Sequence, residues 1–297
     1  MPKESTPSSR TEFVASLDRG LKVLQAFSRD HAQLTLSEVA ALTDLSPATA
    51  RRSLHTLESL GYIGRLGRQF LLRPKVLSLS SGYLSAINAS VVFQPFLQDV
   101  VNEVGGSSSV TVLDDLDIVY LARASANRAI RLMAGVGARY PAYPTSSGRV
   151  LLAFQPDWVI DAYFRRVTLR KLTDTTETNP QKLRQILRNV RTNGFAASQN
   201  EFEYGIAAVA LPIFGQHGRI VAAASCADAT NRLDVSTMVA RRLPTLREAV
   251  QRIESMLSQH PELERSVDSV TADYLPPRAM ARAGRAPART ARPVRRR

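Results

Sequence analysis

Several residue types that would signal a particular chemistry are scarce or missing in this sequence. Cys226 is the only cysteine among 297 residues, which excludes an internal disulfide and a structural zinc site built on several thiolates. Its surroundings, VAAASCADA, are apolar, so we expect a buried thiol rather than a nucleophile. No run of about eighteen apolar residues exists, and the first ten residues lack an apolar core. We therefore expect a cytoplasmic protein with no membrane partner.

The usual signatures of catalysis are also missing. The four histidines show no metal-ligand spacing, and none lies near a candidate serine nucleophile. They are His31, His55, His217 and His260. A phosphate-binding loop and a dinucleotide fingerprint are absent. Glu201 and Glu203 lie two residues apart without an acid or base partner, which favours polar loop residues or hydrogen-bond acceptors. We expect no catalytic residue, no metal and no cofactor.

Acidic residues disappear from the end of the chain, and this fixes where the positive charge lies. The formal net charge is +13, and no acid follows Asp273 whereas eight arginines do. Residues 1–75 carry +4, so the middle of the chain is close to neutral. Charge therefore favours nucleic-acid contact at the two ends only. We expect residues 1–12 and the Ala-, Pro- and Arg-rich segment 261–297 to be disordered.

What the sequence does contain begins with residues 35–63, which scan as two short helices joined by a tight turn. Thr35 and Glu38 have the spacing of a capping box at the start of the first helix. Ser46 is the expected N-cap of the second helix, and Pro47 occupies the first helical position, where its missing N–H costs nothing. This is the outline of a helix-turn-helix, although an ordinary amphipathic hairpin would show the same periodicity.

The segment after the second helix, YIGRLGRQFLL at 62–72, favours DNA binding over that alternative. Two short apolar runs flank Gly67, which predicts a two-stranded wing with basic residues at its tip. A helix-turn-helix with such a wing places its second helix in the major groove. We therefore predict a winged helix-turn-helix domain over 13–73 that binds double-stranded operator DNA. Its candidate DNA contacts are Ser46, Pro47, Ala48, Thr49, Arg51, Arg52, His55, Arg65 and Arg68.

The flanking segments are expected to support this domain and join it to a second one. An apolar helical face is predicted before it, from Phe13, Leu17, Leu21 and Leu24, and we expect this face to pack under the helix-turn-helix. His31 to Leu34 is read as a loop. Residues 74–89 are predicted to form a connector helix whose extra apolar residues would serve self-association.

The second domain, residues 90–260, alternates strand and helix signals. Strands are expected near 107–113, 118–123 and 128–133, and again in FAAS, AAVALPIF and RIVAAAS between 195 and 225. Helices are expected near 90–104, 148–154, 179–192 and 235–257, the last bending near Pro244. Antiparallel hairpins covered by helices give an α/β sheet domain, and the whole chain an α+β class.

One stretch of this second domain has the character of an anion site. Ser147 and Gly148 lie where a helix begins, so backbone amides there could hold a carboxylate. The alternative is that Thr145 or Ser146 simply caps the helix. Arg149 could pair with a ligand or reach solvent.

Four blocks taken together resemble one family. They are SLDRGLKVLQAF at 16–27, residues 34–63, PAYPTSSGRVLLA at 141–153 and NGFAASQNEFEYGIAAVALPI at 193–213. The chain resembles the IclR family of bacterial transcriptional regulators, and most of all the branch controlling aromatic-acid breakdown through the β-ketoadipate pathway. The resemblance implies a GAF-like effector-binding domain after the winged helix. It also implies homodimers on operator DNA, with tetramers as the alternative assembly.

The resemblance also implies a small carboxylate as the effector, which is typical of the family. The resemblance implies that positions matching Ser147, Gly148, Ser198, Ala208 and Ser225 hold it, with Arg149 as a further candidate. Alanines at 207, 208 and 227 replace side chains that are often polar in the family, which suits a more apolar ligand. We therefore expect an aromatic or related acid such as protocatechuate, 4-hydroxybenzoate or β-ketoadipate. Two rival hypotheses are an enzyme of small carboxylates with an accessory DNA-binding domain, and an architectural DNA binder driven by the tail.

Overall fold

The computed structural model describes residues 13–28, 31–80, 89–126, 135–230 and 234–272. The chain divides into two compact units, residues 1–85 and 86–297. Four sequence expectations lie wholly or partly outside the described residues: disorder at 1–12, the second half of the connector helix, the strand at 128–133 and the tail beyond 272. In the part of the chain that is described, no helix is long and apolar enough to cross a membrane.

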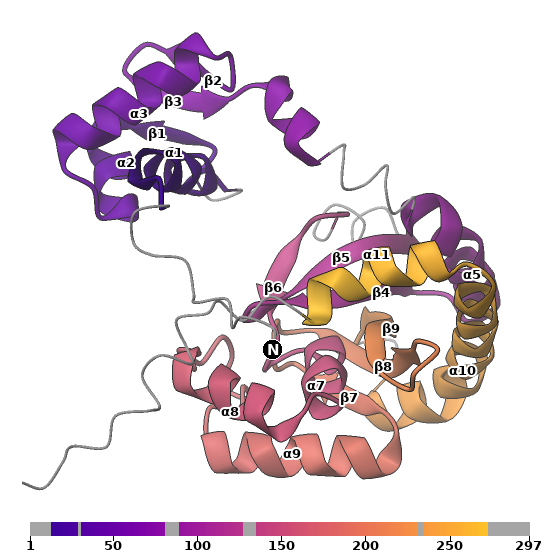
Figure 1. The fold of residues 1–297 in the computed structure, drawn as a ribbon. Helices are drawn as coiled ribbons and strands as arrows, with labels where there is room; N and C mark the ends of the chain where they lie inside the picture. The colour runs from indigo at the N-terminus through magenta and orange to yellow at the C-terminus, as the bar shows by residue number, and fades with distance from the viewer. Residues whose placement is uncertain (1–12, 29–30, 81–88, 127–134, 231–233, 273–297) are drawn as a thin grey trace, which may run out of the picture. The chain divides into compact units, whose positions relative to one another are not determined.

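The first unit is a winged helix-turn-helix, as predicted (Figure 1). Its helices are α1 (Ala15–Gln25), α2 (Leu36–Thr43) and α3 (Pro47–Ser59), and its strands β1 (Gln33–Thr35), β2 (Ile63–Leu66) and β3 (Gln69–Leu72). The strands form an antiparallel sheet in the order β1-β3-β2. β1 lies partly in the segment expected to be a loop; it is only three residues long and is fixed by pairing with distant β3, which local sequence does not reveal.

The capping residues explain why α2 and α3 begin where they do. Thr35 and Glu38 form the predicted capping box, in which the Thr35 amide donates to the Glu38 carboxylate at 2.7 Å. Asp44 takes a left-handed conformation, with φ of 54°, and so closes the turn between the two helices. The Ser46 hydroxyl then accepts from the Thr49 amide at 3.3 Å, which fixes the start of α3.

The predicted packing of the first helix is wrong for three of its four residues; the fourth, Leu24, packs against the core of the first unit. Val23 and Phe27 are the buried residues of this segment, whereas Phe13, Leu17 and Leu21 are 61%, 62% and 47% exposed. Periodicity identifies an apolar stripe but does not say which stripe a neighbouring helix covers. The first unit therefore keeps an exposed apolar face on α1.

The connector begins as a short 3-10 turn, η1 (Pro74–Val76), followed by helical residues through 80, where the described segment ends. Lys75 ties this turn to the end of α3 through a hydrogen bond to the Leu60 carbonyl oxygen at 2.8 Å.

In its described residues, the second unit is a six-stranded antiparallel sheet covered by helices on both faces (Figure 1). The strand order is β6-β5-β4-β9-β8-β7. The strands are β4 (Ser107–Asp114), β5 (Asp117–Ser125), β6 (Arg139–Pro141), β7 (Ala196–Gln199), β8 (Ile206–Phe214) and β9 (Ile220–Ala229). β6 was not predicted, because its three residues lie in a Gly- and Pro-rich stretch whose local sequence carries no strand signal.

Each face of this sheet has its own hydrophobic core. Helices α5 (Ala89–Val104), α10 (Val235–Gln259) and α11 (Pro261–Ala272) enclose one core. Helices α7 (Ser146–Ala153), α8 (Asp157–Arg166) and α9 (Pro180–Asn193) enclose the other. Helix α10 continues through Pro244.

The expectation of disorder from residue 261 onward is wrong for its first twelve residues. These form α11, and Leu263 and Val267 are 8% and 0% exposed in the core shared with α5 and α10. The Ala, Pro and Arg bias of the terminal segment starts only after this helix, so reading the whole segment as one composition hid a short amphipathic pattern.

Candidate DNA-binding face and ligand pocket

Helix α3 presents a mostly exposed face that no part of its own unit covers. Ala50, Leu54 and Leu57 turn into the core, as predicted. At 100° per residue the opposite direction is occupied by Ala48, Arg52 and, slightly to one side, His55. The remaining predicted contacts on this helix are exposed as well, except Thr49, which is half-buried. A helix with small residues at its start and cations further along suits insertion into a major groove.

The wing is a hairpin with a two-residue turn, Gly67–Arg68. Gly67 has φ of 60°, the conformation that a type II′ turn requires at this position and that glycine adopts without strain. Arg65 and Arg68 are both exposed. The guanidinium carbon of Arg65 lies 4.8 Å from the centroid of the Phe70 ring, which holds this cation near the tip of the wing.

The second unit contains a cavity between the sheet and the start of α7. The space between these elements is about 520 Å³, part of which is open to solvent. Three of the predicted effector residues, Ser198, Ala208 and Ser225, line its floor, and Ser147 lines the side formed by α7. The structure therefore brings together four of the six effector residues predicted from the sequence.

The start of α7 is capped by Thr145, one of the two alternatives that the sequence left open. The Thr145 hydroxyl oxygen accepts from the Gly148 amide at 3.0 Å. Gly148 does not line the cavity; a Cβ atom there would overlap the backbone of Ala142. The amides of Ser146 and Ser147, at the first two helical positions, have no acceptor within the helix, and both residues line the cavity.

Arg149 does not line the cavity either. It is buried, and its guanidinium donates to both carboxylate oxygens of Glu201 and, through Nε, to the Tyr143 carbonyl oxygen at 2.9 Å. Glu201 is thus a structural hydrogen-bond acceptor, as expected from the sequence. Arg149 therefore affects the cavity indirectly. It holds Glu201 in place, and Glu201 is one of the residues that line the cavity.

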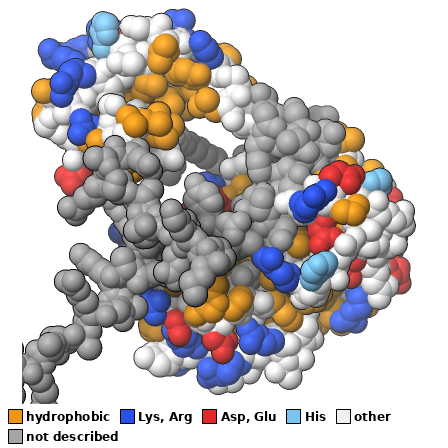
Figure 2. Space-filling view, in the orientation of Figure 1, with side chains coloured by type: hydrophobic (Ala, Val, Ile, Leu, Met, Phe, Trp, Pro, Cys, Tyr) orange, Lys and Arg blue, Asp and Glu red, His pale blue; other side chains and the backbone are white. Residues whose placement is uncertain are grey.

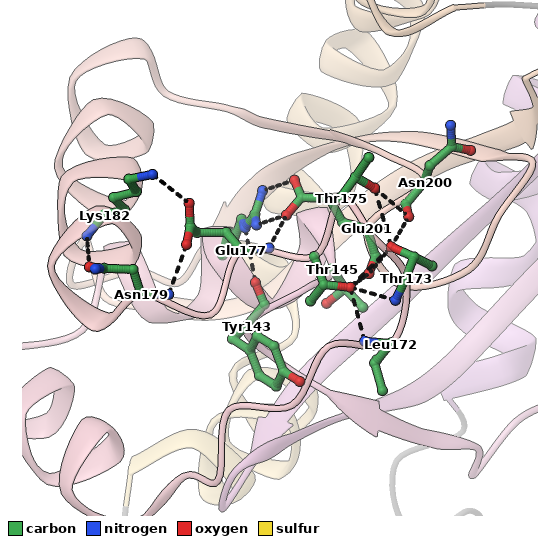
Figure 3. A network of polar contacts seen from close by, with 12 residues as sticks. Tyr143, Thr145, Leu172, Thr173, Thr175, Glu177, Asn179, Lys182, Asn200 and Glu201 are labelled. Atoms are coloured by element: carbon green, nitrogen blue, oxygen red, sulfur yellow. Dashed lines mark hydrogen bonds and ion pairs between the residues drawn. The ribbon is translucent and has the colours of Figure 1, made fainter.

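A polar network fastens the segment that covers the cavity (Figure 3). Thr173 Oγ1 donates to the Asn200 carbonyl oxygen at 2.5 Å, and Thr176 Oγ1 donates to the Glu201 carbonyl oxygen at 2.6 Å. Nearby, the amide of Asn179 donates to Glu177 and lowers the pKa of that carboxyl. Asn200 and Glu201 are therefore held by several side chains, and Glu201 is one of the residues that line the cavity.

Sequence reasoning missed the lining residues of β5, which are Ile118 and the polar pair Tyr120 and Arg123. Arg123 Nη2 donates to Ser107 Oγ at 3.3 Å, and its guanidinium carbon lies 5.6 Å from the Tyr120 ring centroid. Burial raises the pKa of Tyr120, so its phenol stays protonated. The Tyr120 ring is also the first of three neighbouring aromatic rings. Its centroid lies 5.7 Å from the centroid of Tyr140, and the Tyr140 centroid lies 4.6 Å from that of Phe202. No signal in the sequence pairs these residues, because three-residue spacing in a regular strand points to opposite faces.

A winged-helix unit followed by a second unit with a small-molecule cavity defines the class of DNA-binding regulators that respond to a ligand. Comparison with known proteins agrees. Residues 16–67 match the IclR helix-turn-helix domain, and residues 81–255 match the C-terminal domain of the bacterial transcriptional regulator IclR. The chain belongs to the IclR family and is a transcriptional regulator, which confirms the resemblance found in the sequence.

Similar proteins point to one branch of this family. The chain is 36% identical over 236 residues to the Pca regulon regulatory protein of Pseudomonas putida, covering 79% of this chain and 81% of the relative. It is 32% identical to the p-hydroxybenzoate hydroxylase transcriptional activator of Acinetobacter baylyi, covering 85% and 96%. An IclR homologue from Microbacterium hydrocarbonoxydans, solved in complex with 4-hydroxybenzoate, superposes with a TM-score of 0.67 at 26% identity, covering 82% and 99%.

Proposed function

We propose that this regulator controls a catabolic operon for aromatic acids and that its effector is a small aromatic carboxylate. The observation that carries the proposal is the cavity floor, where Ala208 and Ala227 form an apolar surface between serines. Such a floor suits a flat ring with polar substituents better than a small, wholly polar acid. Two of the relatives above carry 4-hydroxybenzoate in their names, which supports the same ligand class. The effectors we propose are 4-hydroxybenzoate and protocatechuate, with β-ketoadipate as the non-aromatic alternative.

Within the cavity, Ser147, Ser198, Ala208 and Ser225 are the proposed effector contacts. Gly148 and Arg149 have an indirect role in the proposal: Gly148 lets the start of α7 pack closely, and Arg149 holds Glu201 in place. The aromatic part of the proposed ligand surface comes from Tyr120 on β5 and from Phe202, which both line the cavity.

The output is proposed to be operator DNA, read by Ala48, Arg51, Arg52 and His55 with Thr49 at the edge. Ser46 and Pro47 set the start of α3, and Arg65 and Arg68 contact the flanking phosphates. We propose that the protein binds this DNA in the cytoplasm.

The apolar face of α1 is proposed to bind a second copy of the chain. Exposed apolar side chains gather on the face of the first unit that Figure 2 shows. Leu17 and Leu60 also border a groove between α1 and α3, and Leu21 is exposed beside them. A homodimer would cover this surface and place two α3 helices about one DNA turn apart. Pairing of two dimers is the proposed route to a tetramer.

The effector can control DNA binding only if it binds the DNA-competent arrangement of the dimer with a different affinity from the incompetent one. The connector that starts at Pro74 is the proposed link, since it joins the two units.

The proposal is tested at both ends of the molecule. Arg52→Ala should weaken operator binding by about 10-fold or more in a gel-shift titration, because a guanidinium contact to base or phosphate is lost. Arg188→Ala, an exposed arginine on α9, is the control and should leave binding unchanged. Ser147→Ala and Ser225→Ala should weaken effector binding in calorimetry. Unchanged values for Arg52→Ala, or for both serine variants, would remove the corresponding site from the proposal.

A further inference from the structure

The cavity offers two different groups for a ligand carboxylate. One is the start of α7, with the amides of Ser146 and Ser147. The other is the guanidinium of Arg123 on β5, which neither the sequence nor the family comparison indicates. Which of them binds the carboxylate decides how the ligand lies.

An irregularity in β5 brings Arg123 to the cavity. Val110 of β4 pairs with Ala122 and Thr111 pairs with Tyr120, so Leu121 has no partner in the ladder. Such a β-bulge shifts the alternation of side chains by one residue. Leu121 and Ala122 therefore both pack in the core beside α5 and α10, while the side chains on either side of them reach the opposite face, where the cavity lies.

The strand register sets Arg123 in a polar row. Arg123 pairs with Ser109 on β4, and Ser109 pairs with Ser225 on β9. The two serine hydroxyls lie 3.0 Å apart. A carboxylate above this row would meet one guanidinium and two hydroxyls, the combination that gives strong charge-assisted hydrogen bonds.

The next row of the floor changes from polar to apolar and back again. Ser107, Ala227, Ala208 and Ser198 follow one another across β4, β9, β8 and β7. With strands about 4.8 Å apart, the row spans about 14 Å between its outer Cα atoms. That length accommodates a benzene ring with one polar substituent at each end.

The charged residues that line the cavity also favour Arg123 as the partner of the ligand carboxylate. Among the described residues that line it, Arg123 is the one cation, and the acids Glu201 and Glu203 lie on the covering segment. Glu201 is neutralised by Arg149, whereas no arginine or lysine among the described residues pairs with Glu203, and its carboxylate disfavours an anion beside it. The start of α7 carries no full charge, so Arg123 provides the stronger attraction.

We propose that Arg123 binds the carboxylate of the aromatic effector. The ring then lies over Ala227 and Ala208, and a hydroxyl para to the carboxylate reaches Ser198. This orientation rests on the proposed function, since it assumes an aromatic acid in this cavity.

The test compares an acid with its neutral isostere. Calorimetry on the full-length chain measures binding of 4-hydroxybenzoate, 4-hydroxybenzamide and benzoate. The unaltered protein should bind the acid about 10-fold or more tightly than the amide. Arg123→Gln should reduce this ratio to within about 2-fold, because the charged partner is gone. The control Arg188→Gln, which makes the same change on exposed α9, should keep the full ratio.

Ser198→Ala reports on the other end of the ligand. It should bring the affinities for 4-hydroxybenzoate and benzoate to within about 2-fold of each other. The preference for acid over amide should remain.

Different results identify different failures. If folded Arg123→Gln keeps the acid-over-amide ratio, the carboxylate binds elsewhere and the inference is overturned, while the proposed function stands. If the unaltered protein binds none of the aromatic acids, the proposed function itself fails. If Arg123→Gln does not fold, Arg123→Met replaces it. Methionine is a flexible side chain without a charge, so an unchanged ratio in that variant also overturns the inference.

Discussion

At the scale of single residues, the most consequential buried charges outside the cavity are Arg242 and Asp228. Their side chains are each 4% exposed, and they form an ion pair. Arg242 also donates to the Gly105 carbonyl oxygen at 3.2 Å. The pair therefore joins α10 to β9 and to the turn that follows α5.

Replacing Arg242 by methionine should lower the free energy of unfolding by about 3–5 kcal/mol, because the Asp228 carboxylate is left buried without its counter-ion. Arg252→Met is the matched control: Arg252 pairs with Asp99 at 2.9 Å, but both side chains are more than half exposed. Arg252→Met should lower the free energy of unfolding by about 1 kcal/mol or less. Urea denaturation measures both, and equal losses would contradict the structural role given to Arg242.

Cys226 offers a prediction with a defined pH dependence. Burial raises the pKa of its thiol to about 12, so the thiolate is scarce at pH 8. We expect a thiol reagent to label the folded protein slowly and the urea-unfolded protein quickly. Since the folded pKa exceeds the unfolded value of about 8.5, this group's contribution to stability is complete below pH 8.5 and is lost as pH rises toward 12. Rapid labelling of the folded chain at pH 8 would contradict the burial.

At the scale of helices and strands, local signals were predicted well and long-range ones were not. The capping box at Thr35 and the Ser46–Pro47 start belong to their own helix, so sequence spacing reveals them. The bulge at Leu121 depends on how β5 pairs with β4, and no local pattern encodes it. Which stripe of α1 remains exposed depends on where the neighbouring helices pack, and the sequence of α1 alone does not show this. The same limit applies to the ligand site. Its serines were predicted from the blocks of sequence that resemble the family, whereas the position of Arg123 follows only from the strand pairing in the sheet.

Helix α11 gives the prediction at this scale. A chain ending after His260 should have a clearly lower melting temperature than one ending after Ala272, because Val267 leaves the core and exposes apolar surface. The chain ending after Ala272 is the control and should melt close to the full-length protein. Thermal unfolding followed by circular dichroism distinguishes the two. Equal melting temperatures for both truncations would show that α11 adds nothing to the core.

At the scale of the whole molecule, the charge lies mainly where DNA is expected to bind. The eight arginines after Ala272 lie beyond the residues matched to the family. Removing residues 273–297 should weaken binding to operator and unrelated DNA by a similar factor and reduce the slope of log affinity against log salt. Fluorescence anisotropy at several salt concentrations measures the slope. A slope that does not change would mean that the tail makes no phosphate contacts.

The measurement that tests the account most directly couples the two units. A duplex selected by the protein from a random pool serves as the operator, and anisotropy titrations at fixed salt give its affinity with and without saturating 4-hydroxybenzoate or protocatechuate. We expect at least one of these acids to change the affinity by about 5-fold or more, the range of ordinary allosteric coupling. Arg123→Gln should bind the same duplex normally and need a higher concentration of the acid for the same response. Equal affinities with and without ligand in the unaltered protein, despite ligand binding, would contradict the claim that the cavity controls DNA binding.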